Sequence, residues 1–121
     1  MWTYSQSTGA MLDPTGAVLA TGYSGNGEWM NHPGEQEVVG HGPLPQGRYT
    51  IGEAQTYPHL GPVAMPLTPD PANTMFGRSG FFIHGDNAEL DHTASDGCII
   101  LDHNSREAIA ASADRVLVVT A

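Results

Sequence analysis

Residues 81–101 read FFIHGDNAELDHTASDGCIIL. The apolar run at 81–83 predicts a short strand that ends at His84, and the run at 99–101 predicts a second strand that begins after Cys98. A polar loop and a Ser-Asp-Gly turn separate the two runs. The pattern therefore predicts two neighbouring strand ends that bring together a histidine and the only cysteine of the chain.

Short β-like runs separated by Gly- and Pro-rich breakers extend on both sides of this stretch. Such spacing favours a β-sandwich or barrel-like sheet. The turn at Asp13-Pro14-Thr15-Gly16 predicts a hairpin in which residues 2–6 pair with residues 17–23. The predicted strands are Trp2–Gln6, Ala17–Tyr23, Val38–Val39, Gly47–Gly52, Val63–Leu67, Phe81–His84, Cys98–Leu101 and Val116–Thr120.

One segment has the composition of a helix. Residues 104–113 are rich in Ala and lack Gly and Pro, and Asp102 or Asn104 can cap the helix. The apolar run that follows, 116–120, does not alternate with polar residues, so we expect a strand buried on both faces. The expected fold is mainly β, with one short helix near the C-terminus, in a single domain spanning residues 1–121.

Composition excludes several function classes. The 121 residues include 13 acidic side chains and 4 Arg but no Lys, which gives a net charge of −9. This argues against a nucleic-acid surface and a polybasic membrane patch. One cysteine excludes an intramolecular disulfide and a multi-cysteine metal cage. No apolar run approaches the ~20 residues of a membrane span, and residues 1–6 do not read as a secretory signal. We expect a monomer that does not insert into membranes.

A histidine beside a cysteine can take the thiol proton or hold a thiolate–imidazolium pair, and either makes the sulfur a nucleophile. Gly97 lets a substrate carbonyl approach the backbone, so the N–H groups around Gly97 and Cys98 can face an oxyanion. A lone cysteine is more often a small buried hydrophobic residue. The paired arrangement in one short window favours the nucleophile.

These residues resemble a known signature. His84-Gly85 followed by Ser95-Asp96-Gly97-Cys98-Ile99 is similar to the His-Gly…Ser-x-Gly-Cys-Ile pattern of L,D-transpeptidase catalytic domains, cysteine enzymes that act on the peptide stems of the bacterial cell wall. The resemblance is closer to the compact L,D-transpeptidase-like toxins delivered by type VI secretion, and it runs from about residue 4 to the end. Supporting segments are Tyr23-Ser24-Gly25-Asn26-Gly27, Gly42–Gly52 and Phe82–Asn87.

The resemblance implies a mechanism and a setting. Cys98 attacks the carbonyl after the third stem residue, and His84 acts as base and then protonates the leaving D-amino acid. Water then gives L,D-carboxypeptidase activity, and a free D-amino acid gives exchange. The resemblance also implies no cofactor, secretion without a signal peptide, action in the periplasm of a target bacterium, and an immunity protein as partner.

Several further residues are candidates for the site. Gly85 belongs to the His-Gly pair, and we expect Ser95 to order the cysteine turn. The tautomer of His84 can be fixed by a backbone carbonyl, by Asp86 or by the 87–95 loop. L,D-transpeptidases usually carry Arg where this chain has Ile100, and Arg78 can substitute for it. The candidate substrate contacts are Tyr23, Trp29, Asp86, His92, Asp96 and Arg78.

Two alternatives stay open. Six His, several Asp and Cys98 can supply mixed metal ligands for a metal-dependent hydrolase, although no pair has HExxH spacing. The same groove can instead belong to a non-catalytic peptidoglycan-binding module. A papain-like or NlpC-like peptidase fits less well, because those families place the cysteine before the histidine.

Overall fold

The computed structural model describes residues 1–86 and 95–121, and within them the protein is mainly β with one α-helix near the C-terminus. This confirms the predicted fold class. Two short 3₁₀ turns, η1 (Gly27–Trp29) and η2 (Pro33–Glu35), lie in the connection between β4 and β5. The strands are β1 (Trp2–Ser5), β2 (Ala10–Leu12), β3 (Val18–Thr21), β4 (Tyr23–Ser24), β5 (Gly47–Ile51), β6 (Gln55–Tyr57), β7 (Gly61–Pro69), β8 (Phe82–His84), β9 (Ile99–Ile100) and β10 (Val116–Thr120).

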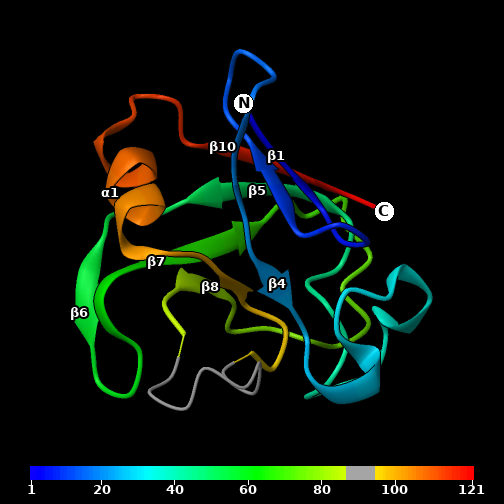
Figure 1. The fold of residues 1–121 in the computed structure, drawn as a ribbon. Coiled ribbons are helices and arrows are strands. Elements are labelled where there is room, and N and C mark those ends of the chain that lie inside the picture. The colour runs from blue at the N-terminus through cyan, green and yellow to red at the C-terminus, as the bar shows by residue number, and fades with distance from the viewer. Residues whose placement is uncertain (87–94) are drawn as a thin grey trace.

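The strands form a nearly closed, barrel-like sheet (Figure 1). Its order is β3-β2-β1-β10-β5-β7-β8-β9-β4, and β6 pairs with β7 beside this path. The pairs β1–β10 and β8–β9 are parallel. Strands β3 and β4 stand at opposite ends of the order, yet only Gly22 separates them in the chain. A Cβ on Gly22 would collide with the Ile100 carbonyl oxygen, so glycine lets the link between β3 and β4 pass close to β9.

The predicted pairing of residues 2–6 with 17–23 is wrong, because β2 lies between them. Strand β1 pairs with β2, and β2 pairs with β3. The chain reverses after β1 in a turn that is closed by the Gly9 N–H donating to the Ser5 carbonyl at 2.9 Å. Gly9 has a φ of +74°, a conformation that other residues rarely adopt. The turn at residues 13–16 is present, but it joins β2 to β3.

Two other strand expectations are also wrong. Val38 and Val39 lie in a turn, where the Gly42 N–H donates to the Val38 carbonyl at 2.9 Å, and Val39 is exposed. Strand β10 is not buried on both faces. Leu117 and Val119 are buried, whereas Val116 and Val118 are half-buried. Only one face of β10 therefore faces the core, and its apolar residues on the other face stay partly in contact with solvent.

The helix α1 (His103–Ala111) begins one residue before the predicted segment and ends two residues earlier. The Asp102 side chain caps it, accepting from the Ser105 N–H at 3.0 Å. The helix ends where Ser112 turns to an extended conformation. Ile109, in the last turn of α1, is fully buried, and the helix packs against β7 (Figure 1).

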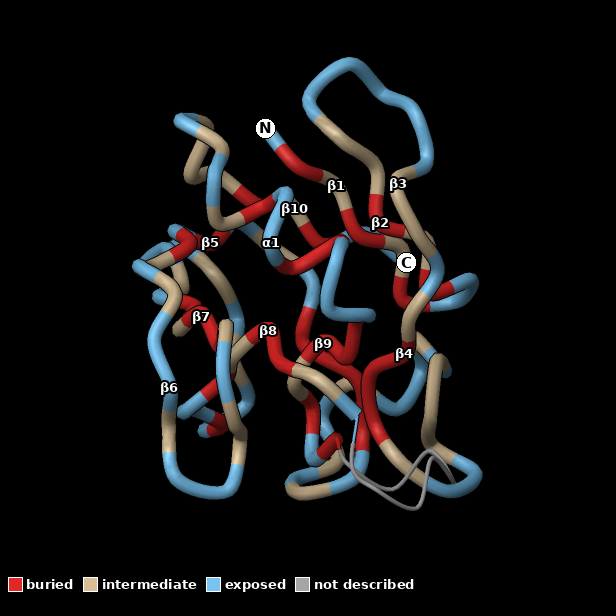
Figure 2. Tube along the Cα trace, turned by 60° about the vertical axis from the view of Figure 1, so that its left-hand side comes forward, coloured by how far each residue is buried: buried red, intermediate tan, exposed pale blue. Residues whose placement is uncertain are grey.

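The core lies inside the curved sheet and continues through β8, β9 and β4 (Figure 2). Its largest fully buried apolar side chains are Tyr4, Tyr49, Met11, Leu44, Met65, Ile83, Ile99, Ile109 and Leu117. The described residues contain no helix that has both the length and the apolar character needed to span a bilayer.

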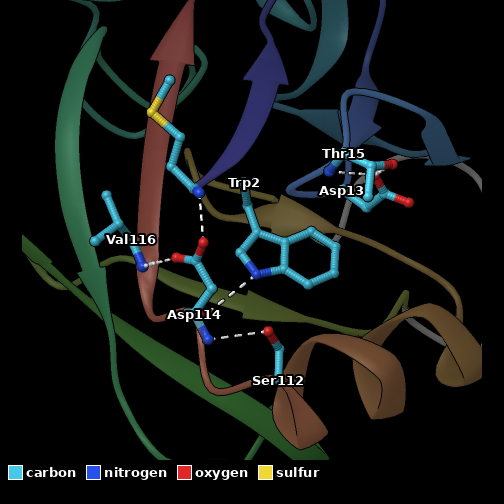
Figure 3. Close-up of polar contacts among 7 residues, drawn as sticks. Trp2, Asp13, Thr15, Ser112, Asp114 and Val116 are labelled. Atoms are coloured by element: carbon cyan, nitrogen blue, oxygen red, sulfur yellow. Dashed lines mark hydrogen bonds and ion pairs between the residues drawn. The ribbon is translucent and has the colours of Figure 1, made fainter.

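Asp114 ties the first strand to the turn before the last one (Figure 3). The Trp2 Nε1–H donates to the Asp114 carbonyl at 3.1 Å. The Asp114 carboxylate accepts from the Val116 N–H at 3.1 Å, and the Asp114 N–H donates to Ser112 Oγ at 3.1 Å. These contacts fix the entry to β10, which pairs with β1 along its length.

Candidate active site

Strands β8 and β9 place His84 and Cys98 at the wall of one cavity. The parallel register pairs Ile83 with Ile99, so Cys98 lies opposite Phe82. Because side chains alternate along a strand, Ile83 and Ile99 enter the core, whereas Phe82, His84 and Cys98 face the cavity. The cavity has a volume of about 350 Å³ and is lined by Leu60, Ser79, Gly80, Phe81, Phe82, His84, Asp96 and Cys98.

The cysteine turn is held by two buried serines. Ser95 Oγ donates to the Cys98 carbonyl at 2.5 Å and accepts from the N–H groups of Gly25 at 2.9 Å and Gly97 at 3.1 Å. Ser24 Oγ, on β4, donates to the Gly97 carbonyl at 2.9 Å. The Gly97 N–H, which was expected to face an oxyanion, therefore already donates to a side chain of the turn.

Arg78 lies behind the same turn. Its guanidinium is buried and donates to the carbonyl oxygens of Asp96, Gly42, Pro43 and Gln36, at distances of 2.5–3.0 Å. Gly97 has a φ of +130°, and a Cβ there would stand 2.5 Å from Arg78 Nη2 and from the Phe81 ring. Arg78 thus holds the turn that presents Cys98, and its hydrogen bonds go to the backbone.

His84 is oriented by the residue that follows it. Its Nδ1 lies 2.8 Å from the Gly85 carbonyl oxygen. A carbonyl only accepts, so Nδ1 carries the proton and Nε2 keeps its lone pair in the neutral ring. Of the acceptors expected for His84, the structure thus shows a backbone carbonyl. Gly85 itself lies against Arg106, whose Nη2 is 2.7 Å from the position that a Cβ on this glycine would occupy.

The site keeps both groups neutral in the free protein. Burial raises the pKa of the Cys98 thiol to about 11, and the Asp96 carboxylate adds to this. The Phe82 N–H, 3.3 Å from Cys98 Sγ, and Arg78 act in the opposite direction. Burial also lowers the pKa of His84, and Arg106 lowers it further. Of the two arrangements left open by the sequence, the structure favours a thiol beside a neutral imidazole.

Comparison of the sequence with models of known protein families identifies the family of this chain. The model of the Tlde1 domain matches residues 19–120, which is most of the chain. The chain belongs to the Tlde1-domain family. By its name this is a type VI secretion L,D-transpeptidase effector family, and that membership is consistent with a peptidoglycan-modifying role. No curated protein matches the chain.

The other candidate residues of this Tlde1 domain are spread over separate places. Tyr23 and Asp86 are hydrogen-bonded to each other at 2.7 Å and line a larger cavity of about 650 Å³, which does not include Cys98. Trp29 stacks on His41, with ring centroids 4.4 Å apart. His92 lies outside the described residues. Only Asp96 joins His84 and Cys98 at the wall of their cavity.

The described part of the Tlde1 domain holds no group of three His, Cys, Asp or Glu side chains close enough to bind a metal ion together. The side chains with the potential to ligate a metal at the cavity of 350 Å³ are His84, Asp96 and Cys98, and they do not form such a group. Within residues 1–86 and 95–121, the donor set around Cys98 therefore does not fit a metal centre.

Sequence reasoning missed two residues of this Tlde1-domain site. In the sequence, Ser24 stands out only as part of a resembling segment, and Arg106 only as part of the predicted helix. Each acts across a long separation, 73 residues from Ser24 to Gly97 and 44 from Arg106 to the Pro62 carbonyl. The chain has only four arginines and no lysine, and two of these arginines are buried. The small number of arginines could therefore have indicated that individual arginines have a structural role.

Proposed function

We propose that this chain is a cysteine acyl-transfer enzyme acting on the peptide stems of peptidoglycan, as an L,D-carboxypeptidase or by exchange of the terminal D-amino acid. The observation that carries the proposal is the cavity shared by Cys98 and His84, in which the Nδ1 of His84 is tied to the Gly85 carbonyl. That bond leaves Nε2 as the basic nitrogen. The family match supports the substrate class.

The proposed reaction begins with a neutral pair. Nε2 of His84 takes the thiol proton as Cys98 Sγ attacks the carbonyl carbon that follows the third stem residue. The Cys98 N–H donates to the oxyanion. The imidazolium then gives its proton to the leaving amine of the D-amino acid, and a thioester remains. Water, deprotonated by His84, releases the stem as a carboxylate, whereas the amine of a D-amino acid restores an amide bond.

Ser95 and Arg78 support this chemistry without entering it. Both are buried, and both bond to the backbone of the turn that carries Cys98. We propose that they position the sulfur, because small displacements of a nucleophile cost much of its reactivity. The setting belongs to the same proposal: a secreted antibacterial effector that acts in the periplasm of a target cell and meets an immunity protein.

The test is incubation of the purified protein with defined muropeptides, with and without a D-amino acid, followed by mass spectrometry. We expect loss of the terminal residue in water and its replacement when the D-amino acid is present. Cys98→Ala and His84→Ala abolish both reactions, whereas His103→Ala on the exposed start of α1 retains them. Trimming of tetrapeptide stems by Cys98→Ala would refute the proposed nucleophile.

One observation favours a second candidate, a non-catalytic peptidoglycan-binding module. The raised pKa of Cys98 makes the free thiol a weak nucleophile. In a binding module, Cys98→Ala binds muropeptides like the parent and no thioester is trapped at low pH. A thioester detected by mass spectrometry at Cys98 excludes that candidate.

A further inference from the structure

Asp96 lies where two cavities meet. It lines the cavity of about 350 Å³ that holds His84 and Cys98, and it also lines a second cavity of about 310 Å³. The two cavities share Ser79, Phe81 and Asp96 in their walls, so they lie side by side, and together they are called the groove below. The second cavity is lined by Val39, Gly40, Gly77, Arg78, Ser79, Phe81 and Asp96. Val39, one of its lining residues, is an exposed aliphatic side chain.

The groove carries one available charge. Among the described residues that line either cavity, Asp96 is the only carboxylate and Arg78 the only arginine. The guanidinium of Arg78 is taken up by four carbonyl oxygens. The carboxylate of Asp96 is exposed and accepts from Asn26 Nδ2 only at 3.4 Å. It therefore keeps most of its capacity to accept hydrogen bonds from a ligand.

This carboxylate opposes the chemistry proposed for its neighbour. A negative charge beside a thiol disfavours the thiolate, and Asp96 adds to the rise in the pKa of Cys98 that burial causes. Arg78 acts on Cys98 in the opposite direction from behind the turn, whereas Arg106 lowers the pKa of His84 and Asp86 raises it. Asp96 also raises the pKa of His84, so this carboxylate favours the imidazolium while it disfavours the thiolate. A ligand with a positive charge resolves the conflict.

We propose that Asp96 binds a primary ammonium group of the substrate, and that this ion pair removes the penalty that the carboxylate imposes on the Cys98 thiolate. The inference rests on the proposed function and adds the class of substrate that activates the nucleophile. Binding of a cationic stem then couples recognition to reactivity, so the thiol stays unreactive in the empty groove. The side chain of a diamino acid at the third stem position carries such an ammonium. The amine of the incoming D-amino acid does not serve, because it must be uncharged to attack the thioester and it arrives after Cys98 has reacted.

The first test measures binding without turnover. Stem tetrapeptides with L-lysine or diaminopimelate at the third position, and the same peptides with the side-chain amine acetylated, are titrated into Cys98→Ala by calorimetry. We expect the free amine to bind about three- to fivefold more tightly, as for a partly exposed ion pair. The preference disappears in Cys98→Ala/Asp96→Asn. Equal affinities for both forms in Cys98→Ala, or no binding of the free-amine peptides, overturn the inference.

The second test measures the thiol in the empty protein. A neutral alkylating reagent such as iodoacetamide is expected to modify Asp96→Asn faster than the parent at pH 8, by about threefold. Glu28→Gln removes the same charge from an exposed residue outside the groove and leaves the rate unchanged. A rate in Asp96→Asn equal to that of the parent contradicts the coupling of Asp96 to Cys98.

Turnover separates this inference from the proposed function. We expect Asp96→Asn to slow hydrolysis of free-amine stems but not of acetylated stems. If Asp96→Asn slows exchange alone and the acetylated and free stems are hydrolysed alike, the inference is overturned. An equal loss on every substrate overturns the inference while the proposed function stands. Failure of the parent to form a thioester refutes the proposed function, and the binding and alkylation results still decide the role of Asp96.

Discussion

The guanidinium of Arg106 lies against Gly85, with Nη2 2.7 Å from the position that a Cβ of this glycine would occupy. Arg106 is buried and donates to the carbonyls of Leu101 at 3.1 Å and Pro62 at 2.7 Å. The Gly85 carbonyl in turn accepts from His84. The histidine of the candidate site is therefore supported through one glycine by an arginine on the helix.

Gly85→Ala is expected to lower turnover by about tenfold to a hundredfold, because the added methyl group displaces either Arg106 or the carbonyl that orients His84. Steady-state cleavage of a stem tetrapeptide measures this. Gly34→Ala is the matched control, since Gly34 has open space at the Cβ position and no positive φ. Full activity in a folded Gly85→Ala protein contradicts the support of His84 through Gly85.

Arg106→Gln is expected to raise the pKa of His84. Arg106 lowers this pKa because its charge opposes the imidazolium, so its removal favours the protonated ring. The neutral base is then lost at a higher pH, and the acidic limb of the pH–rate profile moves upward. NMR titration of the His84 ring measures the same change. A drop in rate with no displacement of either curve indicates that Arg106 acts through packing alone.

Two tyrosines on neighbouring parts of the sheet are expected to respond differently to loss of the hydroxyl group. Tyr4 Oη is buried and has no hydrogen-bond partner among the described residues, so Tyr4→Phe leaves the free energy of unfolding unchanged or higher by up to ~1 kcal/mol. Tyr49 Oη donates to the Pro45 carbonyl at 2.6 Å, and Tyr49→Phe lowers that free energy by ~1–2 kcal/mol. Urea unfolding of the two variants compares them directly.

The cap of α1 makes stability depend on pH. Ser105 bonds lower the pKa of Asp102 below its usual value. This stabilisation is present above the unfolded pKa of about 3.9 and is lost as the pH falls through the lower folded value. Asp102→Ala is expected to cost ~1 kcal/mol at pH 7. Asp102→Asn keeps an acceptor, so it costs less at pH 7 and loses the pH dependence at this position. Urea unfolding at pH 7 and pH 3 measures both effects, and equal stabilities of Asp102→Ala and the parent at pH 7 contradict the cap.

Local patterns predicted the strands that carry the site. The apolar runs before His84 and after Cys98 are strands β8 and β9, because short apolar segments bounded by turns signal buried strands. The helix was also predicted from a local pattern, its Ala-rich composition after a capping residue, and its bounds were correct to within two residues. Strand β2 was missed, since three residues are too few for a periodicity to appear. The Val38–Val39 pair was misread because β-branched residues also occur in turns.

The supports of the site could not be predicted in this way. Ser24 and Arg106 reach the site through contacts that no local pattern records, since Gly97 lies 73 residues from Ser24 and Gly85 lies 21 residues from Arg106. The prediction that the Gly97 N–H faces an oxyanion did not take the Ser95 side chain into account, and Ser95 Oγ accepts a hydrogen bond from this N–H. Side-chain hydrogen bonds of this kind depend on how the strands meet in three dimensions.

The parallel pairing of β1 with β10 has a consequence for how the protein acquires its fold. The first strand finds its central neighbour only when the last five-residue strand is available, so closure of nearly the whole chain precedes completion of the sheet. Sheets dominated by such distant pairings fold slowly, on the order of milliseconds to seconds. We therefore expect the closed sheet and its working cavity to form only after β10 has left the exit tunnel of the ribosome.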